Sequence, residues 1–273
     1  MIRRVLIGTG LILFAISVAA PLAWVVVTSL KSGPEIFASP WGLPKAPQWD
    51  NYVRAWGEAG IAHCFVNSVV VTVGTLAILL PTAATAAYVL ARYPFPGSRA
   101  IYTAFLGGLM FPLFLTIVPL FLLLRDLNLL DSLPGLVVVY VAYSLPFTVF
   151  VLTGFFQTQP QELAEAAMID GCGHTSTFLR VMLPLARPGI VVVAVFNAIG
   201  LWNEYPLALV LLQTPEKQTL SLGIANLSMT QNYQGDWGAL FAGLVIVMAP
   251  LLVVYWIFRD RIHDTMLAGA LKG

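Results

Sequence analysis

Long apolar runs separated by short polar connections dominate the chain. Six of these runs are long enough to cross a bilayer core of about 30 Å, which takes about 20 helical residues. They lie at about residues 5–27, 65–90, 101–124, 134–156, 188–212 and 239–258. Stretches such as Leu136–Val141 are apolar on every face rather than alternating, which favours helices over membrane β-strands. The pattern predicts an all-α, polytopic membrane protein with six transmembrane helices in one domain over residues 1–273.

The composition supports a membrane protein and excludes two other classes. Apolar residues make up 59% of the chain and charged residues 10%, against about 45–50% and about 25% in soluble proteins. So few charges cannot form the surface of a soluble globular enzyme. With 14 basic and 13 acidic residues the net charge is +1, so there is no basic face for nucleic acid.

The distribution of positive charge predicts the orientation. Arg3 and Arg4 before the first apolar run also fit a signal peptide, but the run exceeds the 7–15 residues of a signal core. With that helix retained, six spans put both termini on one side. That side carries Arg3, Arg4, Arg92, Arg99, Arg180, Arg187, Arg259, Arg261 and Lys272, and the other carries Lys31, Lys45, Arg54, Arg125 and Lys217. The excess of positive charge predicts cytoplasmic termini.

The cytoplasmic connection at residues 157–187 predicts two short helices. Pro160 suits the first position of a helix, and Glu162 then lies near its positively polarised end. Gly171 and Gly173 are expected to end this helix, and a second one is expected to begin near Thr175 and to end before Pro184. An amphipathic pair on the membrane surface without a partner is one interpretation of this segment.

Small side chains on the first of these helices favour a second interpretation. Ala164, Ala166 and Ala167 offer a surface that another protein can approach closely. The connection between the two spans is also about three times longer than it needs to be. A docking surface for a partner protein is therefore the alternative to a helix pair that only lies on the membrane.

Residue order in this loop identifies a family. The segment resembles the EAA loop of permease subunits in binding-protein-dependent ABC importers, through Glu165-Ala166-Ala167, Asp170-Gly171, Phe178, Leu183-Pro184 and Pro188. Four further segments resemble the carbohydrate-uptake branch of this family, and within it the second permease subunit of maltose-type systems. They are Asn51-Tyr52, Tyr93–Gly97, Trp202–Tyr205 and Ala268–Gly273. The resemblance covers nearly all of the chain. Cys172-Gly173 departs from it, since members commonly have Ala followed by a variable residue.

This resemblance implies a type I ABC importer permease in a bacterial or archaeal plasma membrane. The implied partners are a second homologous permease subunit, two ATPase subunits, an external solute-binding protein and the lipid bilayer. The implied substrate is a carbohydrate: an oligosaccharide, a sugar, or a sugar phosphate or polyol. The sequence has no G-x-x-x-x-G-K-[ST] phosphate loop. ATP and Mg²⁺ are therefore expected on the ATPase subunits, and this chain is expected to be non-catalytic and to bind no cofactor.

Two groups of residues are predicted to carry the function. By the resemblance, the ATPase-coupling contact comprises Glu162, Glu165, Ala166, Ala167, Asp170 and Gly171. The structural alternative is that Glu165 only complements the helix dipole, worth ~0.3–1 kcal/mol. A possible substrate pathway comprises Trp202, Asn203 and Glu204. Glu204 is placed inside the fifth span, roughly 24 Å from the inner face. An interfacial cluster that anchors the helix end is the equal alternative for these three residues.

Two other functions remain open from the sequence. A stand-alone secondary transporter predicts ionisable groups near mid-membrane and an internal repeat, and spans two to four contain no such group. A non-transporting scaffold has no use for an ATPase-docking loop. His63, His174 and His263 lack the spacing of a metal site.

Overall fold

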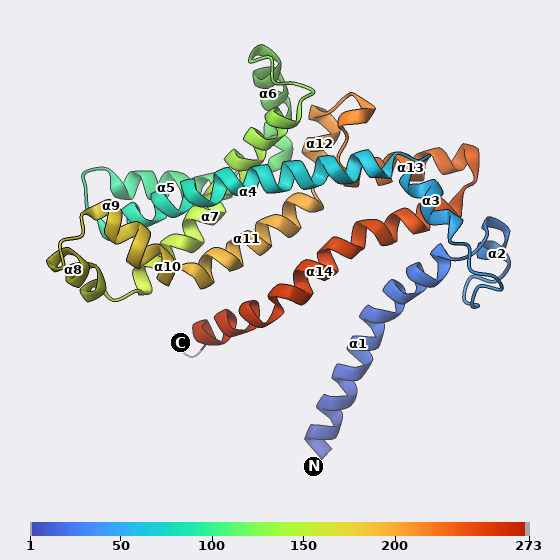
Figure 1. The fold of residues 1–273 in the computed structure, drawn as a ribbon, viewed down its shortest axis with the longest axis horizontal. Coiled ribbons are helices and arrows are strands. Elements are labelled where there is room, and N and C mark those ends of the chain that lie inside the picture. The colour runs from blue at the N-terminus through green and yellow to red at the C-terminus, as the bar shows by residue number, and fades with distance from the viewer. Residues whose placement is uncertain (1, 271–273) are drawn as a thin grey trace. The chain divides into compact units, whose positions relative to one another are not determined.

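The computed structural model describes residues 2–270, and the side chains of all of these except 2, 3, 5, 230–234 and 260–270 (Figure 1). Every regular element in that range is helical, which confirms the all-α prediction. The α-helices are α1 (Ile2–Ser29), α2 (Gly33–Ala38), α3 (Asp50–Trp56), α4 (Ile61–Arg92), α5 (Ser98–Leu109), α6 (Leu113–Asp126), α7 (Leu133–Thr158), α8 (Gln161–Ile169), α9 (His174–Thr177), α10 (Leu183–Leu185), α11 (Arg187–Trp202), α12 (Pro206–Leu211), α13 (Leu220–Gln234) and α14 (Trp237–Ala270). A π-helical turn, η1 (Phe178–Met182), and a 3₁₀ turn, η2 (Pro215–Lys217), complete the set.

Four described helices, α1, α4, α7 and α14, are long and apolar enough to cross a membrane. Two further candidates are bent pairs. One is α5 with α6, bent by 103°, and the other joins His174–Leu185 to α11 with a bend of 71°. Counting each pair as one span gives up to six for the described residues.

The span predicted at 101–124 is not one helix, and the sequence prediction is corrected here. It divides into α5 and α6, with Pro112 between them at φ −66° and ψ 125°. Proline has no N–H to continue a helical ladder, and its ring disfavours helical geometry in the residue before it. Hydropathy does not reveal this break in the helix because both halves are apolar.

The prediction of one helix over 188–212 is wrong for the same reason. Helix α11 ends at Trp202, and α12 starts afresh at Pro206. The three residues between them do not continue either helix. The predicted spans at 5–27, 65–90, 134–156 and 239–258 each lie within one helix.

The chain forms two compact units. The first contains residues 1–66 and 219–252, and the second contains 67–218 and 253–273. In the first unit, the buried amide of Asn51 donates hydrogen bonds to the carbonyls of Ser29 (2.7 Å) and Lys31 (2.9 Å). Arg54 forms an ion pair with Asp236 at 2.8 Å. These contacts connect α3 to the end of α1 and to the start of α14.

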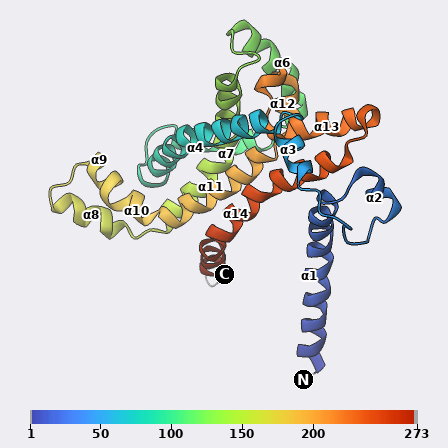
Figure 2. The ribbon, with the colours of Figure 1, turned by 45° about the vertical axis from the view of Figure 1, so that its right-hand side comes forward.

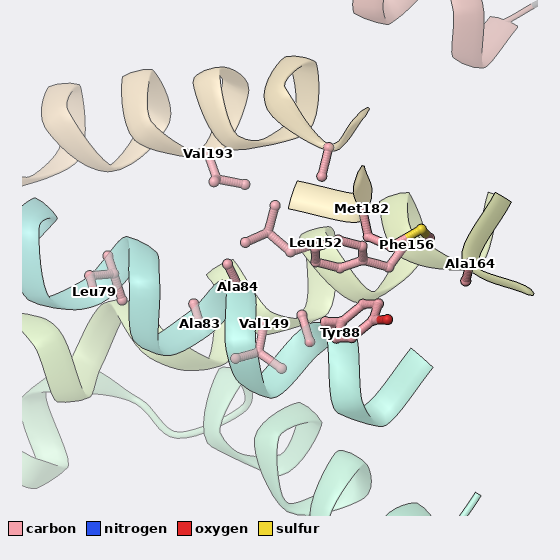
Figure 3. Close-up of a cluster of buried hydrophobic side chains, with 12 residues drawn as sticks. Leu79, Ala83, Ala84, Tyr88, Val149, Leu152, Phe156, Ala164, Met182 and Val193 are labelled. Carbon is pink, nitrogen blue, oxygen red and sulfur yellow. The ribbon is translucent and has the colours of Figure 1, made fainter. Parts of the chain in front are cut away.

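The second unit has a core built from α4, α7, α8, η1 and α11 (Figure 3). Small residues of α4, namely Ala83, Ala84 and Ala87, are buried in one cluster with Val149 and Leu152 of α7. Within this unit α8, α9 and α10 lie together at one end, as both ribbon views show (Figures 1 and 2). The 157–187 loop is thus attached to the core of the helices on either side of it.

Candidate functional site

Helix α8 forms where the sequence predicts it. Pro160 occupies the N-cap position, one residue before the first helical turn. Gly171 has φ +87°, a left-handed conformation that glycine adopts without the penalty of a side chain, and it ends the helix. The second half of the loop starts at His174 and continues through η1 and past Pro184 to Leu185. It is therefore longer than predicted.

Five of the six predicted coupling residues share the open side of this loop. Glu162, Glu165, Ala166, Asp170 and Gly171 are all exposed. Gln161 Nε2 donates a hydrogen bond to Glu165 Oε1 at 2.9 Å.

Ala167 differs from the other predicted coupling residues because it faces its own chain. It is 8% exposed, and Ala164 beside it is 6% exposed and belongs to the core of the unit. Two small side chains thus fix α8 against the protein while its opposite face stays open.

Sequence reasoning missed three apolar residues on the open side of α8. Leu163 is 41% exposed, Met168 38% and Ile169 86%. Exposed apolar side chains grouped on one short helix are typical of a surface that a partner covers. The available signal was the apolar pair Met168-Ile169 at the end of the helix, separated by one residue from the glycine that ends it.

The predicted pathway residues lie at the break between α11 and α12. Glu204 is in the break rather than inside a helix. Its carboxylate accepts hydrogen bonds from the backbone N–H groups of Leu207 (2.7 Å) and Ala208 (3.1 Å) and from the Tyr140 hydroxyl. The carboxylate therefore caps α12 and ties it to α7, since free N–H groups at a helix start need acceptors.

The two neighbours of Glu204 differ in exposure. Trp202 is 7% exposed, so its ring is buried in this conformation. Asn203 is exposed, and its Nδ2 donates a hydrogen bond to the carbonyl of Ile199 at 2.8 Å. Of the three predicted pathway residues, Asn203 is the most exposed and Glu204 is half-buried in this conformation.

The far end of α12 is held by Asp131, in the turn between α6 and α7. Its Oδ1 accepts from the N–H groups of Gln213 (2.9 Å) and Thr214 (3.0 Å). Partial burial disfavours the charged form, yet the hydrogen bonds from Thr214 and Lys217 outweigh it. Together they hold the pKa of the Asp131 carboxyl well below its usual range. Both ends of α12 are thus fixed by a carboxylate.

Within the described residues no group of three or more His, Cys, Asp or Glu side chains could hold a metal ion. What the geometry offers is a helical membrane protein with a partly apolar, exposed helix on the loop between two spans.

The comparisons with known proteins identify the family. Residues 80–265 match the family described as "Binding-protein-dependent transport system inner membrane component", and the chain belongs to this family. It is 45% identical over 262 residues to the diacetylchitobiose uptake system permease protein NgcG of Streptomyces coelicolor, covering 96% of this chain and 87% of that protein. It is 33% identical to the trehalose transport system permease protein SugB of Mycobacterium tuberculosis, covering 93% of this chain and 92% of that protein.

A solved structure shares the fold. It is the crystal structure of a bacterial ABC transporter involved in the import of the acidic polysaccharide alginate, with a TM-score of 0.78 at 23% identity. The match covers 95% of this chain and 96% of the other. The predicted ABC importer permease fold is confirmed.

Family membership also fixes the general activity. The chain is the non-catalytic permease component of a binding-protein-dependent ABC importer, and a multi-pass membrane protein of a prokaryotic transporter. No cofactor is expected in this family. The stand-alone secondary transporter and the scaffold are therefore set aside.

Proposed function

We propose that this chain forms one half of the translocation pore of a sugar importer, as the second of two homologous permease subunits. Two ATPase subunits bind on the cytoplasmic side and hold ATP and Mg²⁺, and a solute-binding protein delivers the sugar from outside. Both termini lie in the cytoplasm. The positive charge on the 157–187 side of the membrane supports this orientation.

Coupling to the ATPase is assigned to the exposed face of α8, and one observation carries this assignment. Acidic and apolar side chains share that face, while Ala164 and Ala167 fix the opposite face to the core. Glu162 and Glu165 offer carboxylates to basic or polar groups of the ATPase, and Ile169 offers an apolar anchor. Closure of the ATPase dimer then displaces α8, and the packed alanines pass the displacement to the helices as a rigid-body switch.

A disaccharide or short oligosaccharide is the proposed substrate class. Relatives named for diacetylchitobiose and trehalose uptake share 45% and 33% identity with the chain. The difference in identity makes diacetylchitobiose the first ligand to test. Asn203 is the proposed contact of this chain with the passing sugar, since it is exposed at the break beside Glu204, whose carboxylate caps α12.

The test is purification and reconstitution of the whole complex. The tagged chain is expressed with its genomic neighbours, and the proteins that purify with it are identified. We expect a second permease, an ATPase and, with ligand present, a solute-binding protein. Proteoliposomes should then accumulate labelled diacetylchitobiose only with the binding protein and ATP. Uptake by this polypeptide alone, without nucleotide, contradicts the proposal.

A further inference from the structure

The loop of residues 157–187 contacts α4, a helix to which the chain does not directly connect it. His174, the first residue of α9, lies against Tyr93, which follows α4. The Tyr93 hydroxyl and His174 Nδ1 are 3.0 Å apart. Their ring centroids are 5.5 Å apart, with an interplanar angle of 80°. The two residues are 81 positions apart in sequence, so the contact is purely tertiary.

Aromatic rings continue this contact into the core. The Tyr88 ring of α4 lies 4.8 Å from the ring of Phe178 in η1 and 5.4 Å from that of Phe156 in α7. Figure 3 shows Tyr88 beside Phe156 within the cluster. The hydroxyls of Tyr88 and Tyr93 are 3.5 Å apart. The end of α4 is therefore linked to the second half of the loop by tilted and edge-on ring contacts and by one exposed hydrogen bond.

The contact region between the end of α4 and the 157–187 loop also contains buried polar atoms that have no hydrogen-bond partner among the described residues. The Arg92 guanidinium donates a hydrogen bond to the carbonyl of Gln159. However, Arg92 Nε, Gln159 Oε1 and Thr177 Oγ1 are buried with no hydrogen bond to any described residue. The backbone beside them is the π-turn Phe178–Met182. A rigid anchor would have these atoms paired, and π-turns occur often at functional positions in helices. The contact region between α4 and the loop is therefore suited to a second packing arrangement of these side chains.

We propose that Tyr93 and His174 are positioning residues that transmit the displacement of the 157–187 loop to α4. This inference rests on the proposed coupling role of α8. The loop is continuous with α7 and α11, so the backbone itself carries its movement to them. Helix α4 has no such continuity and depends on side-chain contacts at its end. Because the Tyr93–His174 bond is exposed, its loss should change coupling much more than folding.

The experiment uses the complete reconstituted transporter. Tyr93→Phe removes only the hydroxyl, and His174→Ala removes the ring. His174→Asn keeps a polar atom near the position of Nδ1. Tyr255→Phe is the matched control, because Tyr255 is 59% exposed and its hydroxyl has no hydrogen bond to any described residue. The measurements are sugar transported per ATP hydrolysed, the KM for ligand-loaded binding protein, and the amount of ATPase that purifies with the complex.

We expect Tyr93→Phe and His174→Ala each to lower sugar transported per ATP about threefold or more. KM and ATPase content should stay unchanged, and His174→Asn should retain at least half of the wild-type ratio. The double variant should be no worse than the poorer single variant, because both remove one link. An unchanged ratio in the first two variants overturns the inference, as does an equal loss in His174→Asn and His174→Ala. Absence of ATPase from the wild-type complex instead contradicts the proposed function.

Discussion

The carboxylate of Asp131 lies 3.0 Å from the ammonium group of Lys217, 86 positions later in the chain. The same lysine donates a hydrogen bond to the backbone carbonyl of Asp131 at 2.7 Å. Asp131 itself has a positive φ of 51°, so its backbone is held in a conformation that most residues avoid. The turn before α7 and the segment after α12 are therefore held together by these two residues.

Asp131→Asn should lower the free energy of unfolding by about 1–3 kcal/mol at neutral pH, because it removes a charged acceptor that is mostly shielded from water. The pKa of the Asp131 carboxyl is depressed in the folded state. Its stabilisation is thus complete above the unfolded pKa of about 4 and is lost as the pH falls through the lower folded value.

Thermal unfolding in detergent at pH 7, 5 and 3 measures this contribution. The difference between wild type and Asp131→Asn should be similar at pH 7 and 5 and should shrink toward pH 3. Asp126→Asn is the control, since the side chain of Asp126 is 67% exposed and, among the described residues, pairs only with its neighbour Arg125. That variant should change stability by less than about 0.5 kcal/mol. If the stability difference between wild type and Asp131→Asn instead grows as the pH falls, the lowered pKa assigned to the Asp131 carboxyl is contradicted.

Local signals explain what could be predicted from the sequence. Pro160 and Gly171 act on the backbone of their own segment, so they predicted α8 within one residue at its start. The breaks at Pro112 and Pro206 had equally local signals, but the uniform apolarity of these stretches favoured single helices. Counting apolar residues does not distinguish a straight span from a bent pair.

Tertiary contacts explain what could not be predicted. Glu204 caps α12 while accepting from Tyr140, 64 positions earlier, and no sequence period relates the two residues. Likewise the burial of Ala167 depends on which face of α8 meets the rest of the chain. The sequence could identify a segment that docks, but it could not identify which of its residues remain accessible.

Gly171→Val should abolish ATP-driven uptake while membrane insertion persists. A β-branched residue at φ +87° is strained, at a cost of about 1–2 kcal/mol for the left-handed conformation, so the end of α8 must change. Steric overlap with other residues is not the cause, because a Cβ at this position would meet no described atom within 4 Å. Gly171→Asn, which tolerates this conformation better, should keep part of the uptake.

Gly173→Ala provides the matched control two residues away. Gly173 has φ −71°, and a Cβ there also meets nothing within 4 Å. Uptake in proteoliposomes and membrane content by immunoblot separate loss of coupling from loss of protein. Normal uptake by Gly171→Val would falsify the role assigned to this turn.

Gly189→Ala should destabilise the second unit by about 1–3 kcal/mol through overpacking. A Cβ at Gly189 would lie 2.5 Å from Cγ of the Phe155 ring, which contacts α11 from α7. Gly154→Ala on α7 is the control, because its Cβ meets nothing within 4 Å. Alanine at such a helical position should be neutral or stabilising by about 0.4–1 kcal/mol. Equal melting temperatures in detergent for the two variants argue against close packing at Gly189.

Ile169→Glu should reduce the amount of ATPase that purifies with the permease by about tenfold or more. Ile169 is 86% exposed at the end of α8, so a carboxylate costs the isolated chain little. In a closed interface the same carboxylate is buried without a partner, at a cost of several kcal/mol. This asymmetry separates a binding surface from an element that only stabilises the fold.

The conservative replacement Ile169→Val removes one methylene group and leaves the surface apolar, so it should retain most of the bound ATPase. Quantitative pulldown from detergent extracts gives the ratio of ATPase to permease for both variants, and the melting temperature of each permease checks its folding. Wild-type ATPase content in Ile169→Glu, with a normal melting temperature, would place the docking surface elsewhere on the loop. Glu162 and Glu165, on the open side of α8, would then be the next positions to reverse in charge.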